Sequence, residues 1–283
     1  APPDVSARLL GQKMSESIGQ AVVVENRSGA GGTVGGSAAA KAAPDGYTLL
    51  MGSSSSLAIG PVLFPAAGYV PTRDFAPISQ ISNQPFVIAV PTSLKVDGLA
   101  QFIALIKANP GKYNYATPQN GSPPHMSAEL LSRATGISMV HVPFGSIPKG
   151  MQALVTGDAH LYIEVVPTFV AQIRAGTIKA LAVAGARRTP FLPDVPTAAE
   201  SGLPGFEIGS WSAVVAPAGT PGPIVQRLNQ EVHKAMATRE VQEGFNKQMA
   251  EIVVGTPEEL ARHIANEFTK WGKLIAEARI KPD

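Results

Sequence analysis

Short apolar runs rich in β-branched residues alternate with amphipathic stretches along this chain, and this alternation constrains the fold most. The runs include Ala21–Val24, Tyr47–Met51, Phe86–Val90 and Leu161–Val165. In most of the stretches that follow, apolar residues recur every three to four positions, as in a helix with one buried face. Alternating strands and helices form βαβ units, and continuous apolar strands indicate sheets covered on both faces. The sequence therefore predicts an α/β fold with mostly parallel sheets flanked by helices.

The composition restricts the class of protein further. Apolar residues make up 45% of the 283 residues and charged residues 16%, which is enough apolar material for packed cores. The net charge is +2 and no basic stripe is present, so nucleic acid is not an expected partner. No apolar run reaches about 18 residues, the length needed to span a membrane. The absence of cysteine excludes disulfides and thiolate chemistry.

Four glycine- and hydroxyl-rich segments next to predicted helix starts are the candidate binding loops. In open α/β sheets ligands bind outside the carboxyl ends of strands, where helix N-termini present N–H groups and partial positive charge to anions. None of the four contains arginine or lysine, so they would hold a carboxylate by neutral donors. Ordinary turns also favour glycine and serine, so the prediction depends on all four together. The candidate residues are Asp4, Ser53, Ser54, Ser55, Ser56, Gln119, Asn120, Gly121, Ser122, His125, Phe144, Gly145 and Ser146.

Four side chains have two interpretations each. His125 stands at a predicted helix start, where it either donates to a ligand carboxylate or caps the helix. Phe144 and Trp211 adjoin Gly-Ser sequences and are candidates for the wall of the site, although such residues more often pack in a core. Glu164 ends an apolar strand that we expect to be buried. It is either a structural acid or a residue that faces the ligand. An unpaired acid beside an anion must find a donor, take up a proton or face an ammonium group.

The sequence does not support an enzyme. Residues 52–56 fail the G-x-S-x-G pattern of a serine hydrolase because Ser56 stands where glycine is required. The five histidines are scattered, and no sequence context marks one of them as the base of a triad. Residues 29–33 lack the lysine of a phosphate-binding loop, and neither H-E-x-x-H nor a paired acidic cluster is present. We therefore expect no catalytic residue, no metal and no cofactor.

Two segments are specific enough to indicate a family. Residues 23–32, VVENRSGAGG, are followed by residues 39–50, AAKAAPDGYTLL, and shorter matches occur at 74–78, 191–197 and 216–221. Together they resemble the Bug family, the substrate-binding receptors of tripartite tricarboxylate transporters, over essentially the whole chain. The resemblance implies a type II periplasmic-binding-protein fold, in which two α/β lobes joined by two crossing strands hold the ligand in a cleft. Lobe one is then 1–90 plus 213–283, and lobe two is 91–212.

The resemblance also implies a function. Family receptors bind small carboxylates, including dicarboxylates, acidic amino acids and aromatic acids, through the same loops that are identified above. The expected protein is a periplasmic monomer that delivers its ligand to a membrane permease of the tripartite type. A co-receptor that presents the ligand to a membrane sensor kinase would use the same site, and it is the alternative. The lack of arginine in the loops argues against a highly charged tricarboxylate.

The sequence departs from the family pattern in three places. Family members usually carry a strand and a Pro/Gly-rich loop before the first helix, whereas this sequence begins almost at that helix and shows no signal peptide. We therefore expect about a dozen further residues ahead of it, the length of an ordinary strand and loop. Glu164 stands where aspartate is common. Phe144 stands where tyrosine is common, which removes a hydroxyl and makes the wall of the site more apolar.

Overall fold

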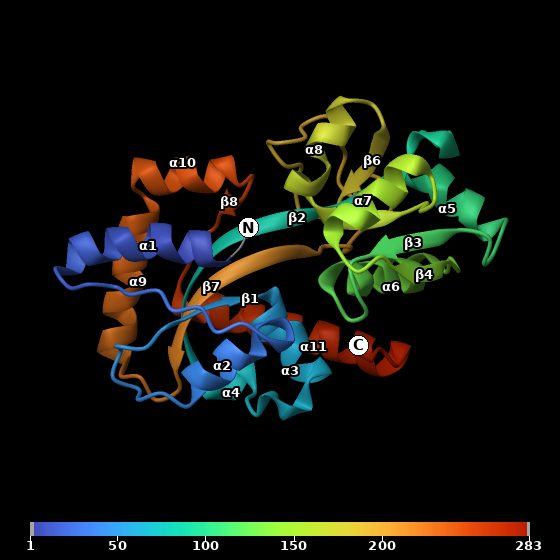
Figure 1. The fold of residues 1–283 in the computed structure, drawn as a ribbon. Coiled ribbons are helices and arrows are strands. Elements are labelled where there is room, and N and C mark those ends of the chain that lie inside the picture. The colour runs from blue at the N-terminus through green and yellow to red at the C-terminus, as the bar shows by residue number, and fades with distance from the viewer. Residues whose placement is uncertain (1–2, 282–283) are drawn as a thin grey trace. The chain divides into compact units, whose positions relative to one another are not determined.

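The computed structural model describes residues 3–281, which form two compact units. The first unit contains the described chain up to Asn83 together with Trp211–Lys273, and the second contains Gln84–Ser210 together with the chain from Leu274 onward. The boundaries fall inside the strands β2 (Phe75–Pro91) and β7 (Gly209–Pro217) and the helix α11 (Pro257–Ala278) (Figure 1). The predicted lobe boundaries, 90/91 and 212/213, lie in the same two strands.

The first unit is a short sheet covered by helices. Its strands β1 (Leu50–Ser53) and β8 (Glu251–Ile252) run antiparallel to β7 and β2 respectively, and β7 neighbours β2. Leu10 and Met14 lie one helical turn apart, so both face the core, where they cluster with residues of β2, α9 and α10. The helices are α1 (Pro3–Ile18), α2 (Thr33–Ala40), α3 (Gly60–Leu63), α4 (Pro71–Asp74), α9 (Gly222–Met236) and α10 (Arg239–Lys247), with short turns η1 (Ala30–Gly32), η2 (Ser55–Ile59) and η3 (Pro65–Ala67).

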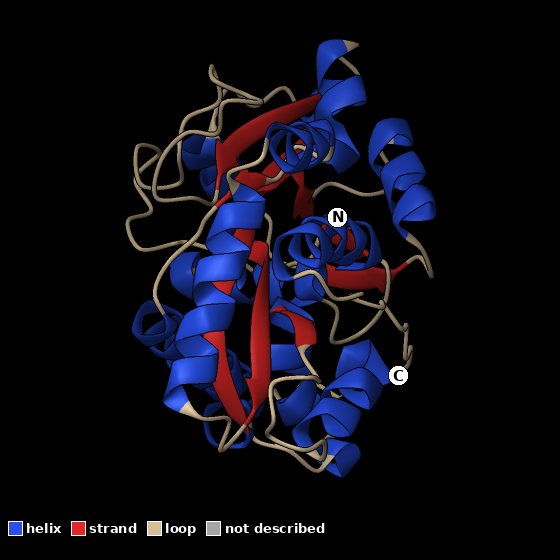
Figure 2. Ribbon diagram, turned by 90° about the vertical axis from the view of Figure 1, so that its left-hand side faces the viewer, coloured by secondary structure: helices blue, strands red, loops and turns tan. Residues whose placement is uncertain are grey.

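The second unit has a sheet ordered β6-β2-β5-β3-β4. The strands besides β2 are β3 (Asn114–Thr117), β4 (Val140–Pro143), β5 (Tyr162–Val165) and β6 (Ile178–Val183). β3 pairs parallel with both β4 and β5, whereas β2 pairs antiparallel with β5 and β6. The helices of this unit are α5 (Leu99–Lys107), α6 (Pro123–Thr135), α7 (Ile147–Thr156) and α8 (Val166–Arg174), with the turn η4 (Thr92–Leu94). Figure 2 shows helices packed against the strands.

The α/β fold class is confirmed, but the sheets are mixed rather than mostly parallel. Parallel ladders join β5, β3 and β4, which are connected through the helices α6 and α7, and an isolated parallel bridge joins Val183 to Thr197. All the pairs that β2 forms with β5, β6 and β8 are antiparallel. An apolar run indicates burial and gives no strand direction, so the sequence could not reveal this mixture.

The predicted strand at Ala21–Val24 is wrong. No strand forms there, and Val23 is 85% exposed. The strand predicted at Tyr47 begins only at Leu50, and the Tyr47 side chain is 93% exposed. A strand needs a hydrogen-bonded neighbour, and both segments instead line a cavity in the first unit. The predicted loop Ser53–Ser56 is also more ordered than expected, because Ser53 ends β1 and Ser55 begins the π-helical turn η2.

Candidate ligand-binding site

The strand register of the second unit brings three predicted site segments to one edge of its sheet. Thr117 pairs with Pro143 and Ala116 with Tyr162, so the parallel strands β3, β4 and β5 end almost level. The loops after β3 and β4 and the end of β5 at Glu164 therefore meet at this edge, each directly before a helix. The carboxyl edge of parallel strands is where α/β proteins bind ligands.

The start of α7 is the part of this edge that offers free donors. Gly145 adopts a left-handed conformation, with φ of +80°, and Ser146 is extended before the helix. Within the described chain, the N–H groups of Gly145, Ser146 and Ile147 donate to no other protein atom. The Ser146 hydroxyl caps α7 by accepting from the Lys149 N–H at 3.5 Å. Consecutive N–H groups at a helix start form an anion-binding site, so a carboxylate fits here.

Phe144 holds this loop beside β3. Its N–H donates to the Thr117 carbonyl at 2.8 Å, which continues the β3–β4 pairing by one residue. The side chain of Phe144 is half-buried. The predicted role of Phe144 as an apolar wall beside the free donors is compatible with this position.

The start of α6 uses most of its donors internally. Pro123 and Pro124 have no N–H, and the His125 N–H donates to the Ser122 hydroxyl at 3.5 Å. The Gly121 N–H donates to His125 Nδ1 at 2.9 Å, and the Ser122 hydroxyl donates to the Gln119 carbonyl at 2.7 Å. Gln119 is exposed and Asn120 half-buried. His125 therefore holds this loop in place through Nδ1, and its contact with a ligand stays a prediction.

A stack of rings beneath the loop was missed by the sequence interpretation. The His125 and His141 rings are parallel with centroids 3.9 Å apart, and Tyr115 stacks on His141 at 5.0 Å. His141 Nε2 lies 2.6 Å from the Thr117 hydroxyl, and the Tyr115 hydroxyl donates to Glu129 at 2.6 Å. Only the parallel register of β3 and β4 places Tyr115 beside His141, and single-sequence reasoning has no signal for that register.

Glu164 is a buried acid at the same edge. Its side chain is 6% exposed, and it accepts hydrogen bonds from the Thr168 hydroxyl at 3.3 Å and from the Val165 N–H. Burial raises the pKa of Glu164 to about 7, and these two hydrogen bonds oppose the rise only partly. Tyr162, two residues earlier on the same face of β5, has a buried hydroxyl without a partner among the described residues.

Three of the predicted residues of the first unit lie around one cavity. Asp4, Ser53 and Ser56 line it, and its volume is about 910 Å³. The Ser53 N–H donates to the Ser56 hydroxyl at 2.9 Å, while the Ser56 N–H reaches the Ser53 hydroxyl at 3.4 Å. Ser54 is buried and Ser55 half-buried. The serine run therefore satisfies much of its own hydrogen bonding.

The Asp4 carboxylate hydrogen-bonds to neighbouring side chains of the protein. Its carboxylate accepts from Arg8 Nε at 3.0 Å and from the Asn26 amide at 2.6 Å. The hydrogen bonds from Arg8 and Asn26 lower the pKa of Asp4, so the side chain is ionised at neutral pH. An ionised Asp4 repels a carboxylate, which favours a structural role over the predicted contact with ligand.

Trp211 packs in the interior of the first unit. The side chain is 2% exposed, and its indole N–H donates to Glu267 Oε2 at 3.2 Å. Glu267 Oε2 also accepts from the Trp271 indole at 2.9 Å, and the His263 ring meets Trp211 edge-on at 4.7 Å. Of the two interpretations of Trp211, its burial favours core packing.

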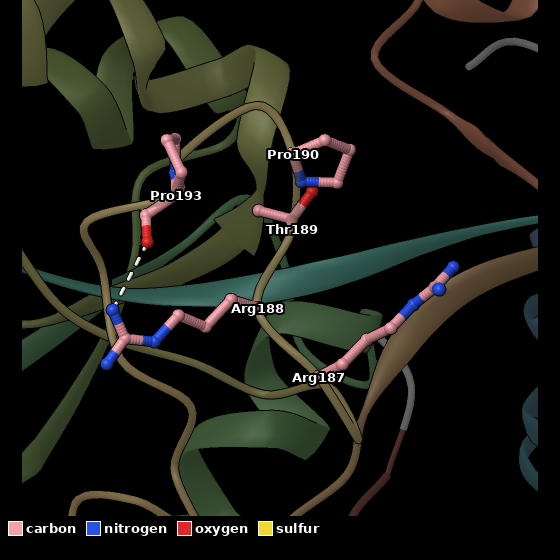
Figure 3. A pocket seen from close by; sticks show the side chains of 5 residues that line it. All are labelled: Arg187, Arg188, Thr189, Pro190 and Pro193. Atoms are coloured by element: carbon pink, nitrogen blue, oxygen red, sulfur yellow. Dashed lines mark hydrogen bonds between the residues drawn. The ribbon is translucent and has the colours of Figure 1, made fainter.

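A second cavity, in the second unit, contains none of the predicted site residues. It has a volume of about 330 Å³ and is lined by Arg187, Arg188, Thr189, Pro190 and Pro193 (Figure 3). The Arg188 guanidinium donates to the Pro193 carbonyl at 3.2 Å and pairs with Glu200 at 3.0 Å. Because Glu200 neutralises Arg188, this cavity is a weaker candidate for an anion than the start of α7.

The described residues lack two features that other kinds of protein need. Among residues 3–281, no group of three His, Asp or Glu side chains is placed to hold a metal ion. In the same residues, no helix has both the length and the apolar character needed to cross a membrane.

Comparison with known proteins identifies the family. The family model described as "Tripartite tricarboxylate transporter family receptor" matches residues 6–280. The chain belongs to this family. The resemblance to Bug proteins is confirmed by BugT of Bordetella pertussis, which is 38% identical over 279 residues, 98% of this chain and 86% of BugT.

Solved structures of similar proteins include two with carboxylates bound. Rpa4515 of R. palustris with adipate is 35% identical, with a TM-score of 0.79 over 99% of this chain and 94% of that one. MatC of Rhodopseudomonas palustris with malate is 33% identical, with a TM-score of 0.76 over 97% and 95% of the two chains. The periplasmic binding protein BugD is 31% identical, with a TM-score of 0.77 over 100% and 95%. This family member is therefore a periplasmic solute-binding receptor and not an enzyme.

Proposed function

We propose that this receptor captures a small carboxylate, an aliphatic or aromatic mono- or dicarboxylate or an acidic amino acid, and delivers it to a tripartite-type membrane permease. The observation that carries the proposal is the run of free N–H groups at Gly145, Ser146 and Ile147, at a helix start beside the half-buried Phe144. Such a site suits one carboxylate and leaves apolar surface for the rest of the ligand. The adipate and malate bound to Rpa4515 and MatC support this ligand class.

In the second unit, the α7 amides are the donors that remain available to a carboxylate. In the first unit, Ser53 lines the cavity and Ser55 is half-buried, so their hydroxyls are a separate set of candidate donors. A ligand that binds one conformation of the receptor more tightly than another shifts the population toward that conformation. A permease that recognises only this conformation would accept the loaded receptor and reject the empty one.

A thermal-shift and calorimetric panel tests the proposal. Adipate, malate, aspartate, benzoate and citrate are titrated into the purified receptor, and we expect at least one of the first four to bind with a Kd of about 10 μM or tighter. At 1 mM, such a ligand stabilises the folded protein by about 2.7 kcal/mol. Citrate should bind more weakly, because no arginine or lysine lies in the α7 loop. If all five fail to bind, the proposed function is wrong.

Delivery to a permease needs a separate test. Immobilised receptor is incubated with membranes that contain the cognate permease subunits, with and without the best ligand of the panel. We expect permease retention only with ligand present. Retention of a sensor kinase in place of the permease would support the alternative function instead.

A further inference from the structure

Glu164 stands out among the acids of the second unit because it is buried without a cationic partner. Its side chain is 6% exposed, and within the described chain no lysine, arginine or histidine forms an ion pair with it. Its two donors, the Thr168 hydroxyl and the Val165 N–H, are both neutral. A buried acid in such surroundings is stable only if it keeps a proton or meets a donor from outside the protein.

The described elements packed against β5 give Glu164 no cationic partner. On α6, the His125 ring lies 4.0 Å from the Glu129 carboxylate and Arg133 pairs with Glu277. On its own strand β5, the ring of Tyr162 packs edge-on against Phe169 of α8, at 5.6 Å, and against Gly150 of α7. The paired residues 86–91 of β2 contain no titratable side chain. Arg174 is the only charged residue of α8 and lies at its far end, and Lys149 of α7 is exposed.

The strand β3 also supplies no cation to pair with Glu164. On β3, the only titratable side chain is Tyr115, and its hydroxyl donates to Glu129. Tyr162 is thus the nearest titratable neighbour of Glu164 in sequence and face, and its hydroxyl is itself buried without a partner in the described chain.

Glu164 lies within reach of a ligand that occupies the α7 amides. Ala116 of β3 pairs with Val142 of β4 on one side and with Tyr162 of β5 on the other. Two residues further along, Glu164 is therefore level with Phe144, and β3 lies between them. Two strand spacings separate their backbones, about 10 Å. A short dicarboxylate with one end on the amides of Gly145 and Ser146 is therefore long enough to bring its other end near Glu164.

We infer that Glu164 recognises the second carboxylate of a dicarboxylate ligand as a protonated acid, donating its O–H to a carboxylate oxygen, so that capture carries one proton into the complex. This inference rests on the proposed function. No covalent bond forms, because the proton stays shared in a hydrogen bond between two carboxyl groups. An ionised Glu164 in the same place would repel the ligand.

The sign of the pH effect follows from the raised pKa of Glu164, about 7. The protonated form predominates below that value, so dicarboxylate affinity is highest in acid and falls as pH rises through 7. Above that point, each pH unit lowers affinity about tenfold, because one proton must be taken up from solution. A ligand that meets Glu164 through an ammonium group would show the opposite dependence, with affinity rising from pH 6 to 8.

The first test measures adipate and malate binding by calorimetry from pH 5.5 to 8.5, in buffers of different ionisation enthalpy. For the natural sequence we expect uptake of about one proton per ligand at pH 8. Glu164→Gln keeps a donor that cannot ionise, so its affinity should be independent of pH and exceed that of the unmodified receptor at pH 8. Glu258→Gln removes an exposed acid of α11 and is the matched control, which should behave as the unmodified receptor.

The second test needs no ligand. The carboxyl carbons of the glutamates are followed by NMR across the same pH range, with Glu164→Gln used to assign the signal. A Glu164 midpoint near 7 is expected, and a midpoint in the ordinary range near 4.5 overturns the inference.

The two tests also separate the inference from the proposed function. Binding of adipate or malate with pH-independent affinity and no proton uptake overturns only the role of Glu164. Affinity that rises with pH overturns it as well and points to an ammonium ligand. No binding by any carboxylate at any pH overturns the proposed function itself.

Discussion

The predicted binding residues of the two units use their polar groups in different ways. In the second unit, Gly145 and Ser146 follow a strand in a parallel pair and precede a helix, and their N–H groups remain free for a ligand. In the first unit, Ser53 ends an antiparallel strand and hydrogen-bonds to Ser56 in the turn that follows. Similar residue types therefore leave their N–H groups free at the strand–helix junction of the second unit. In the first unit they hydrogen-bond to one another within a turn.

The largest expected effect tests the structural role of Trp211. Glu267→Ala leaves the indole N–H groups of Trp211 and Trp271 buried without their acceptor, which should lower the free energy of unfolding by about 2–4 kcal/mol. Chemical denaturation measures this loss, and Glu267→Gln, which keeps an acceptor oxygen, should recover part of it.

The same variant distinguishes the two interpretations of Trp211. If Trp211 only packs in the first unit, the folded fraction of Glu267→Ala binds adipate with unchanged affinity. A tenfold loss of affinity without loss of stability would instead place Trp211 in the ligand site.

The next effect tests the free amides of the second unit. Ile147→Pro removes one N–H at the first position of α7, where proline fits a helix, and Ser146 already has the extended backbone that precedes proline. Loss of one hydrogen bond to a carboxylate should weaken adipate binding about tenfold to a hundredfold, by calorimetry. Arg239→Pro makes the same change at the start of α10 and should leave affinity unchanged. Equal affinity in the two variants would show that the α7 amides do not hold the ligand.

A smaller effect is expected from His125, whose ring accepts a hydrogen bond from the loop before α6. His125→Ala leaves the buried Gly121 N–H without its acceptor and removes one ring of the stack, at a cost of about 1–2 kcal/mol in unfolding free energy. Adipate affinity should fall only several-fold, because His125 acts through the loop. His125→Asn retains an acceptor at that end of the side chain and should restore part of both losses. An affinity loss as large as that of Ile147→Pro would make His125 a direct ligand contact.

The smallest effect is expected at the second cavity. Arg188→Ala removes a surface ion pair with Glu200, and such pairs contribute little to stability. Neither the melting temperature nor adipate affinity should change measurably. A clear loss of affinity would move the anion site from α7 to the cavity lined by Arg187 and Arg188.

The elements that the sequence predicted well are those with a local signal. The helices from Pro123 and Ile147 follow from serine and proline at their starts and a single apolar face. The Phe144–Ser146 loop lies between β4 and α7 as expected, and its role in holding an anion stays a prediction. These features depend on neighbours in the chain, so one sequence suffices to find them.

The features that the sequence missed depend on distant partners. Only Phe86–Val90 was predicted of the 17-residue strand β2, because polar residues interrupt its first half. One of them, Ser79, is buried and donates to the carbonyls of Gln80 and Gly255, a residue 176 positions away. The stack of His125 on His141 and the pairing of Trp211 with Glu267 are likewise contacts between remote segments. No local pattern encodes such contacts.

The most direct test of a carboxylate held by neutral amides is the backbone amide NMR spectrum during an adipate titration. The N–H groups of Gly145, Ser146 and Ile147 should move downfield together, saturate at one ligand per protein and show the largest shifts in the second unit. Saturable binding with these three signals unmoved, and with the shifts confined to residues 187–193, would contradict the account.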